Sequence, residues 1–164
     1  IRRGPNRSDG PETQGPWTIV SAKSEGATPG FQIRTASGER YVIKLDPAGY
    51  VKIPSSTEVV ATKLYYAAGY NTPENYLVRF HPQILQISPR ATIVDWRGVE
   101  RAFTQTDLEE LLQRARRQPD GTVQALASKF LAGKPVGPFA YAGMRRDDFA
   151  SPRCVRSRPR NCSP

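Results

Sequence analysis

Three segments near the start of the chain alternate apolar and polar residues with the two-residue period of a β-strand. They are WTIVSAKSE (17–25), FQIRTAS (31–37) and RYVIKLD (40–46). Short connections that contain glycine separate them, over Gly26–Gly30 and at Ser37-Gly38. Strands joined by such short turns pair with each other antiparallel. The pattern therefore predicts an antiparallel meander, against which the later elements must pack.

Two helices are predicted from capping boxes, in which a Ser or Thr is followed three residues later by an acid. Ser55-Ser56-Thr57-Glu58 starts the first helix, over 56–68, which ends at Gly69 and carries on one face Val60, Leu64, Ala67 and Ala68. Thr106-Asp107-Leu108-Glu109 starts the second, whose apolar residues recur at helical spacing: Leu108, Leu111, Leu112 and Ala115.

Further strands are expected after the first helix and after the second. Apolar, strand-like runs occupy 76–80, 83–88 and 122–133, and 91–96 is expected to form a hairpin with 99–103. An extended, proline-broken segment follows at 134–143. Together these elements predict an α+β fold in which an antiparallel sheet of about five or more strands packs with two helices.

The two ends of the chain differ in composition from the middle. Residues 1–16 contain three prolines, three glycines and little apolar surface, so we expect a disordered leader. Residues 149–164 hold four arginines with Ser, Pro and Cys and no periodicity, which predicts a disordered tail of the kind that a reading-frame slip would produce. The folded domain is expected over 17–148.

Charge and cysteine content exclude several classes of protein. The net charge is +9, but the tail contributes much of it, so the basic balance alone is weak evidence for nucleic-acid binding. A single histidine, His81, and two cysteines, both in the tail, do not supply a Cys/His zinc framework. No apolar run approaches the ~18 residues that a membrane-spanning helix needs.

Lys44 is the residue that most suggests chemistry. It lies within Tyr-Val-Ile-Lys-Leu-Asp, and alternation places Val42, Lys44 and Asp46 on the face opposite Tyr41, Ile43 and Leu45. A lysine on a buried central strand loses hydration, a cost that an anion such as a phosphate or a carboxylate offsets. The alternative is an ordinary solvated lysine. Glu58 has two candidate roles, as the acid of its own capping box with Ser55 or as an ion-pair partner of Lys44.

The order of the predicted elements resembles that in the amino-terminal lobe of the protein-kinase-like fold. This order is a strand, a glycine turn, a second strand, a third strand that carries Lys44 and a helix that carries Glu58. The resemblance spans 15–148 and is closest to HipA-type and phosphoinositide-kinase-like proteins and to uncharacterised bacterial proteins with similar V-I-K-L-D-P, G-Y-N-T-P-E-N-Y and A-S-K-F-L-x-G-K-P-x-G-P-F stretches. It implies that Lys44 and Glu58 form a nucleotide-binding pair. It also implies that the 24–30 turn contacts phosphate through Gly26, Thr28 and Gly30, whereas a plain hairpin turn is the alternative.

The resemblance further implies that the chain is a truncated ATP-binding lobe. Phosphoryl transfer in this fold requires a catalytic-loop Asp and Asn and a metal-binding Asp from a carboxy-terminal lobe, so Mg²⁺ binding and activity are expected to need that missing lobe. The competing hypothesis is a basic α+β binding module for nucleic acid or an acidic protein. Its cationic residues would be Arg114, Arg116, Arg117, Lys129 and Lys134.

Overall fold

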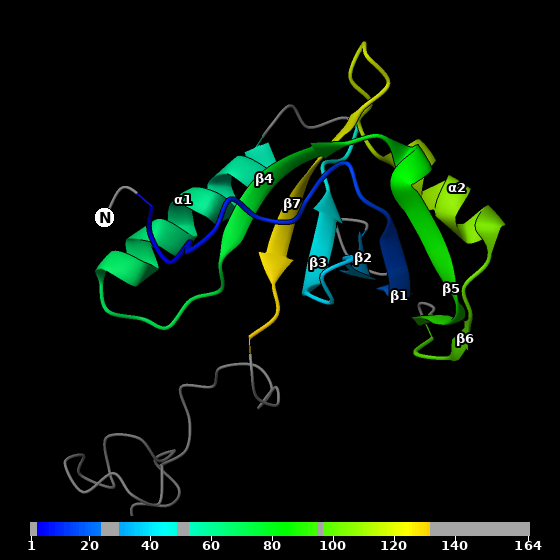
Figure 1. Cartoon of the computed structure of the whole chain (residues 1–164), viewed down its shortest axis with the longest axis horizontal. Coiled ribbons are helices and arrows are strands. Elements are labelled where there is room, and N and C mark those ends of the chain that lie inside the picture. Colours follow the sequence, from blue (N-terminus) through cyan, green and yellow to red (C-terminus); the bar gives the residue numbers. More distant parts are fainter. Residues whose placement is uncertain (1–2, 24–29, 49–52, 95–96, 132–164) are drawn as a thin grey trace, which may run out of the picture. The chain divides into compact units, whose positions relative to one another are not determined.

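Seven strands form one mixed sheet in the computed structural model of the chain, which describes residues 3–23, 30–48, 53–94 and 97–131. The strand order is β4-β7-β3-β2-β1-β5-β6 (Figure 1). The strands are β1 (Trp17–Lys23), β2 (Gly30–Arg34), β3 (Arg40–Leu45), β4 (Asn75–Phe80), β5 (Leu85–Val94), β6 (Glu100–Ala102) and β7 (Val123–Lys129). The helices are α1 (Ile53–Ala67), α2 (Gln105–Arg114) and the short 3₁₀ helix η1 (Pro82–Ile84). The predicted α+β class with two α-helices is confirmed.

The predicted β1-β2-β3 meander is present, and β7 and β4 extend it antiparallel beyond β3. The sheet is not wholly antiparallel, because β5 runs parallel to β1. The chain leaves β4 at one edge, turns at η1 and joins the other side of the sheet. Strong curvature makes this short crossing possible, since the rings of Trp17 at the start of β1 and Phe80 at the end of β4 lie 4.7 Å apart. The predicted separate strands at 83–88 and 91–96 are one strand, β5, which pairs with β6.

The hydrophobic core lies on one face of the sheet. In β3 the expected alternation is confirmed, because Tyr41, Ile43 and Leu45 are fully buried while Val42 and Lys44 are half-buried. The apolar stripe of α2 also packs into this core through Leu108, Leu111 and Leu112. Its capping box, however, is formed by Thr104 and Asp107, two residues before the predicted pair.

Residues 3–16 of the predicted leader have a described course and contact the sheet, in contrast to the disorder expected over 1–16. Residues 3–16 run along β4 and across the sheet (Figure 1). The Asn6 side chain donates to the backbone oxygen of Asn75 and accepts from its N–H, so it pairs with edge strand β4 as another strand would. Further along, the Trp17 indole donates to the Glu12 carbonyl at 2.7 Å. Polar side chains and backbone groups, rather than apolar area, attach most of this segment.

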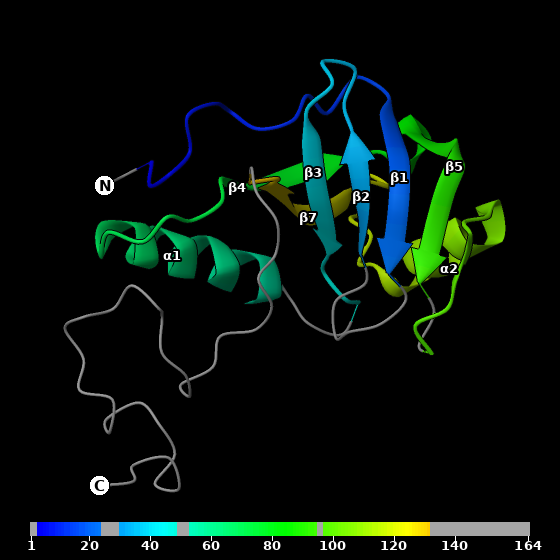
Figure 2. The same cartoon turned by 90° about the horizontal axis from the view of Figure 1, so that it is seen from below.

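Helix α1 lies at the β4 end of the sheet and α2 at the β5 end (Figures 1 and 2). The apolar face predicted for α1 does not pack on the sheet, because Val60 and Leu64 are 58% and 67% exposed. The helix face that meets the sheet is polar instead. No helix of the described residues is long and apolar enough to cross a membrane. The predicted segments at 134–143 and 149–164 lie outside the described residues.

Candidate functional site

An ion pair joins the strand and the helix that the sequence singled out. The Nζ atom of Lys44 in β3 lies 2.6 Å from Oε1 of Glu58 in α1. Both side chains remain accessible, at 39% and 36% exposure. The pair is therefore neither a buried structural bridge nor two freely solvated charges. Of the two roles considered for Glu58, the structure shows the ion pair.

The lysine side chain lies on the face of the sheet opposite the core. Its cross-strand neighbours are Gly30 in β2 and Leu126 in β7. A Cβ atom at Gly30 would stand 2.5 Å from the carbonyl oxygen of Ile43, so close backbone approach requires glycine there. Gly30 therefore leaves one flank of Lys44 without a side chain. Gly30 is thus the cross-strand neighbour of Lys44, and its expected phosphate contact remains a prediction.

Three polar contacts hold α1 on this face, spaced along the helix at residues 55, 58 and 62. At the first, Asp46 accepts hydrogen bonds from the backbone N–H and the hydroxyl of Ser55, at 3.2 and 2.7 Å. The Lys44–Glu58 pair is the second. At the third, the Asn75 amide donates to the hydroxyl of Thr62. Intervals of three and four residues place these contacts on one helix face, so the strand, the helix and the ion pair are positioned together.

The Ser55–Glu58 capping box that the sequence predicted is not formed. Ser55 lies inside α1, which begins at Ile53, and its hydroxyl donates to Asp46. The Asp46 carboxylate, contributed by the strand, thus meets the first turn of the helix, where N–H groups lack partners within the helix. Gly26 and Thr28 lie outside the described residues, so their expected phosphate contacts remain a prediction.

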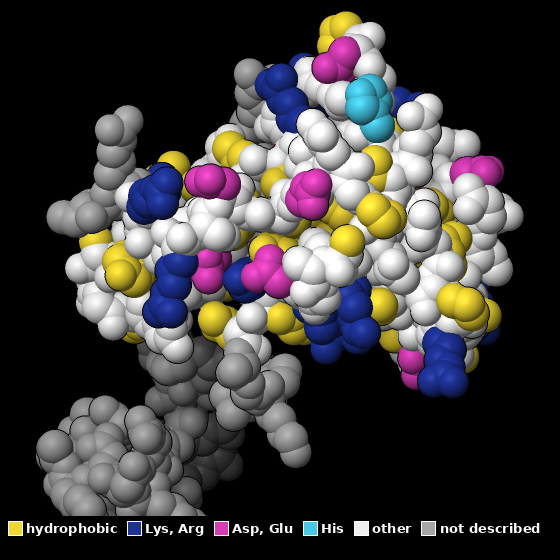
Figure 3. Space-filling view, in the orientation of Figure 1, with side chains coloured by type: hydrophobic (Ala, Val, Ile, Leu, Met, Phe, Trp, Pro, Cys, Tyr) yellow, Lys and Arg dark blue, Asp and Glu magenta, His cyan; other side chains and the backbone are white. Residues whose placement is uncertain are grey.

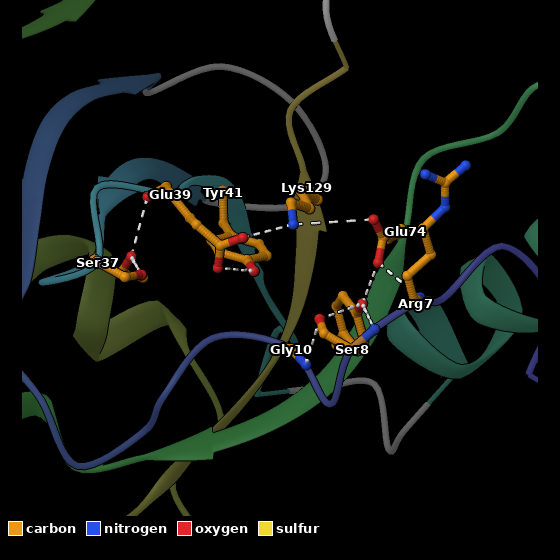
Figure 4. A network of polar contacts seen from close by, with 10 residues as sticks. Arg7, Ser8, Gly10, Ser37, Glu39, Tyr41, Glu74 and Lys129 are labelled. Atoms are coloured by element: carbon orange, nitrogen blue, oxygen red, sulfur yellow. Dashed lines mark hydrogen bonds and ion pairs between the residues drawn. The ribbon is translucent and has the colours of Figure 1, made fainter.

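A second polar network lies on the core face of the sheet, where β3, β7 and the leader meet (Figure 4). Lys129 donates to Glu39 at 2.6 Å and lies 4.0 Å from Glu74, which also accepts from the Tyr76 hydroxyl. The hydrogen bond from Lys129 lowers the pKa of Glu39. The same bond raises the pKa of Lys129. These groups form hydrogen bonds and ion pairs with one another, so the network has a structural role.

This network also weakens the case for a basic binding module. Lys129, one of its proposed cations, is neutralised by Glu39. Arg114 and Arg117 are exposed and Arg116 is half-buried, whereas Lys134 lies outside the described residues. On the face seen in Figure 3, Lys and Arg side chains are interspersed with Asp and Glu. That distribution is typical of a solvated surface rather than of a continuous basic patch.

Sequence reasoning missed the residues that position the ion pair. Strand alternation puts Asp46 on the same face as Lys44, and its position two residues after Lys44 is the signal for a role beside it. Thr62 and Asn75 gave no such signal, because they are ordinary helix and strand polar residues until the fold brings them together. Among the described residues no cluster of three or more His, Cys, Asp or Glu side chains is arranged to hold a metal ion.

The ammonium of Lys44 has three donors, and the bond to Glu58 uses one. The remaining donors and the partial exposure leave the ammonium accessible from solvent. Comparison of the chain with family models, with curated proteins and with solved structures finds no match.

Proposed function

We propose that the sheet face carrying Lys44 binds the phosphate groups of a nucleotide, as the ATP-binding lobe of a kinase-like protein would. The observation that carries the proposal is the accessible Lys44–Glu58 pair. A lysine held by a carboxylate points in a fixed direction, and its other N–H groups remain available to phosphate oxygens.

The surroundings of Lys44 favour an anion-binding role over a buried structural one. One side of the lysine lacks a side chain at Gly30, and α1 covers the sheet through polar contacts that keep Glu58 in place. The apolar Leu126 supports the other side. A phosphate adds negative charge beside Glu58, and the ammonium between them offsets that repulsion.

The proposal concerns phosphate binding and not transfer. The residues that the resemblance requires for transfer, a catalytic Asp and Asn and a metal-binding Asp, would come from a second lobe. We therefore expect weak, Mg²⁺-independent binding of ATP by this chain, and no phosphate transfer. The second lobe is accordingly a proposed partner of the same sheet face.

Titration of the chain with a fluorescent ATP analogue, displaced by unlabelled ATP, tests the proposal. Replacing Lys44 by Met is expected to weaken binding at least about tenfold, the equivalent of about 1.4 kcal/mol. The matched control is Lys129→Met, which removes a different strand lysine that is also 2.6 Å from a glutamate. Absence of displaceable binding at millimolar ATP, or equal losses in the two variants, would refute the proposal.

A further inference from the structure

A polar pocket lies where the start of the leader passes α1 and β4 (Figure 1). Its volume is about 530 Å³, within the range of about 300–1,000 Å³ that is usual for small-molecule sites. Neither Lys44 nor Glu58 lines it, so it is separate from the site proposed above for ATP. We call it the leader pocket; its lining consists of Arg3, Asn6, Ser8, Asp9, Lys63 and Tyr76.

Gly4 brings the leader backbone against the side chain of Lys63 in α1. The φ of Gly4 is +61°, and a Cβ atom there would stand 2.8 Å from Cγ of Lys63. Such a close approach of backbone to a side chain requires glycine. The aliphatic stem of Lys63 is therefore packed, and this residue is half-buried although its ammonium is polar. This contact holds the cation at the leader pocket.

The neutral polar groups of the leader pocket already have partners within the protein. The Asn6 side chain donates to the backbone oxygen of Asn75 and accepts from its N–H. The hydroxyl of Tyr76, a residue that is only 6% exposed, donates to Glu74 and contacts the Ser8 hydroxyl at 2.9 Å. Ser8 and Glu74 lie close together in this network (Figure 4). These groups thus leave little hydrogen-bonding capacity for a ligand.

The unused donors of the leader pocket belong to its two cations. Within the part of the chain that the structure describes, the Lys63 ammonium has no hydrogen-bond or ion-pair partner. The Arg3 guanidinium has one, Asp9, at 3.5 Å, and these side chains are 72% and 99% exposed, so the pair is weak. Spare donors on two cations, one from the leader and one from α1, favour a ligand that accepts hydrogen bonds and carries negative charge.

We propose that the leader pocket binds a small phosphate-bearing ligand whose phosphate group lies between Arg3 and Lys63. A phosphate has acceptor oxygens in several directions, so it can bond to cations on two sides at once, and guanidinium and ammonium groups both bind it. The pocket is larger than a phosphate ion, which leaves room for a small organic group beside Ser8 and the ring of Tyr76. Asp9 competes for Arg3, but its almost complete exposure to water screens its repulsion of the ligand.

NMR titration of the isotope-labelled whole chain with glycerol phosphate, at constant ionic strength, tests the proposal. Saturable shift changes are expected in the amides of residues 3–9 and around Lys63, with a dissociation constant on the order of 1 mM. Lys63→Met keeps the stem that packs against Gly4 but removes the charge, and it is expected to raise that constant at least about tenfold. Asp9→Asn removes the competing acid and is expected to lower it. Arg34→Gln, at an exposed arginine of β2, is the matched control and is expected to bind like the wild type.

Lys44→Met is also expected to bind glycerol phosphate like the wild type, which separates this proposal from ATP binding. Circular dichroism of each variant verifies that the fold is retained. Inorganic phosphate in a parallel titration distinguishes the sources of the group: equal affinity indicates free phosphate as the ligand, and weaker affinity indicates a phosphate ester.

Three results would overturn the proposal. The first is the absence of saturable changes at residues 3–9 and Lys63 up to about 50 mM glycerol phosphate. The second is an affinity that Lys63→Met leaves unchanged, or that Arg34→Gln weakens to the same extent. The third is binding that Lys44→Met abolishes, because the phosphate would then occupy the other site.

Discussion

Ser55 donates both its backbone N–H and its hydroxyl to the carboxylate of Asp46, at 3.2 and 2.7 Å. Both residues are almost fully buried. Asp46 follows Lys44 by two residues, directly after the end of β3, and Ser55 precedes Glu58 by one helical turn on α1. This contact therefore sets the distance between strand and helix at the point where the ion pair forms. The position of Glu58 depends on a neighbouring contact that does not itself touch Lys44.

Replacing Asp46 by Ala is expected to lower the free energy of unfolding by about 1–3 kcal/mol, because it leaves two buried donors of Ser55 without an acceptor. Asp46→Asn keeps one carbonyl oxygen and is expected to lose less. Urea denaturation measures both effects. A matched control is Asp9→Ala, since the Asp9 side chain is 99% exposed. Equal stability of Asp46→Ala and the control would show that the contact does not fix α1.

The Lys44–Glu58 pair is expected to contribute little to stability despite its short distance. Both side chains are more than one-third exposed, and pairs of this kind contribute about 0.2–1 kcal/mol. A double-mutant cycle with Lys44→Met and Glu58→Gln, followed by urea denaturation, measures that coupling. A coupling well above 2 kcal/mol would mean that the pair itself holds the helix, contrary to the role assigned to Asp46. Low coupling makes any loss of nucleotide affinity in these variants a binding effect.

Local patterns predicted much of the sheet, because the alternation in 40–46 and the helical spacing of the α2 leucines reflect burial directly. The same reasoning was wrong about α1. An apolar stripe predicts that a face will be buried, but it does not say against which partner. The sheet face next to the helix carries Asp46, Lys44 and Asn75. These residues contact Ser55, Glu58 and Thr62, which recur at intervals of three and four residues on one face of α1.

The contacts of the leader and the direction of β5 could not be predicted from the sequence for a different reason. Asn6 pairs with the backbone of Asn75 across 69 residues of chain, and such contacts leave no periodic signal. The parallel pairing of β5 with β1 depends on the curvature of the sheet, which the sum of many strand twists determines. The sequence left two roles open for Glu58, in a capping box with Ser55 or in an ion pair with Lys44. Both roles use an acidic residue near the start of a helix.

Acid is expected to destabilise the protein partly through Asp107. Two hydrogen bonds from Arg101 and further bonds from Thr104 lower the pKa of this carboxyl well below its usual range. A carboxyl whose pKa is lower in the folded state stabilises the fold above its ordinary pKa and loses that contribution as the pH falls through the folded value. The loss is thus expected to begin below about pH 5 and to continue at lower pH.

Asp107→Asn is expected to be less stable than the wild type at pH 7 and to show a smaller fall in stability between pH 5 and pH 3. Urea denaturation at each pH measures the difference. Part of the fall should remain, because hydrogen bonds lower the pKa of Glu39 as well. Asp9→Asn is expected to keep the acid dependence of the wild type. An unchanged slope in Asp107→Asn would contradict the assignment.

The ordered leader is tested by a pair of glycines that have similar backbone conformations but different surroundings. Gly10 and Gly38 have φ of +94° and +84°, so an alanine at either position is strained. At Gly38 an added Cβ meets nothing within 4 Å, whereas at Gly10 it would stand 2.8 Å from the ring of Tyr76. Gly38→Ala is therefore expected to lower the free energy of unfolding by about 1–2 kcal/mol, and Gly10→Ala to lower it more because the leader must also move off β4.

Urea denaturation of both variants, with limited proteolysis within residues 3–16, measures the difference. If the leader were detached in solution, Gly10→Ala would cost nothing while Gly38→Ala kept its full effect, and cleavage near residue 10 would be equally fast in the wild type and in Gly10→Ala.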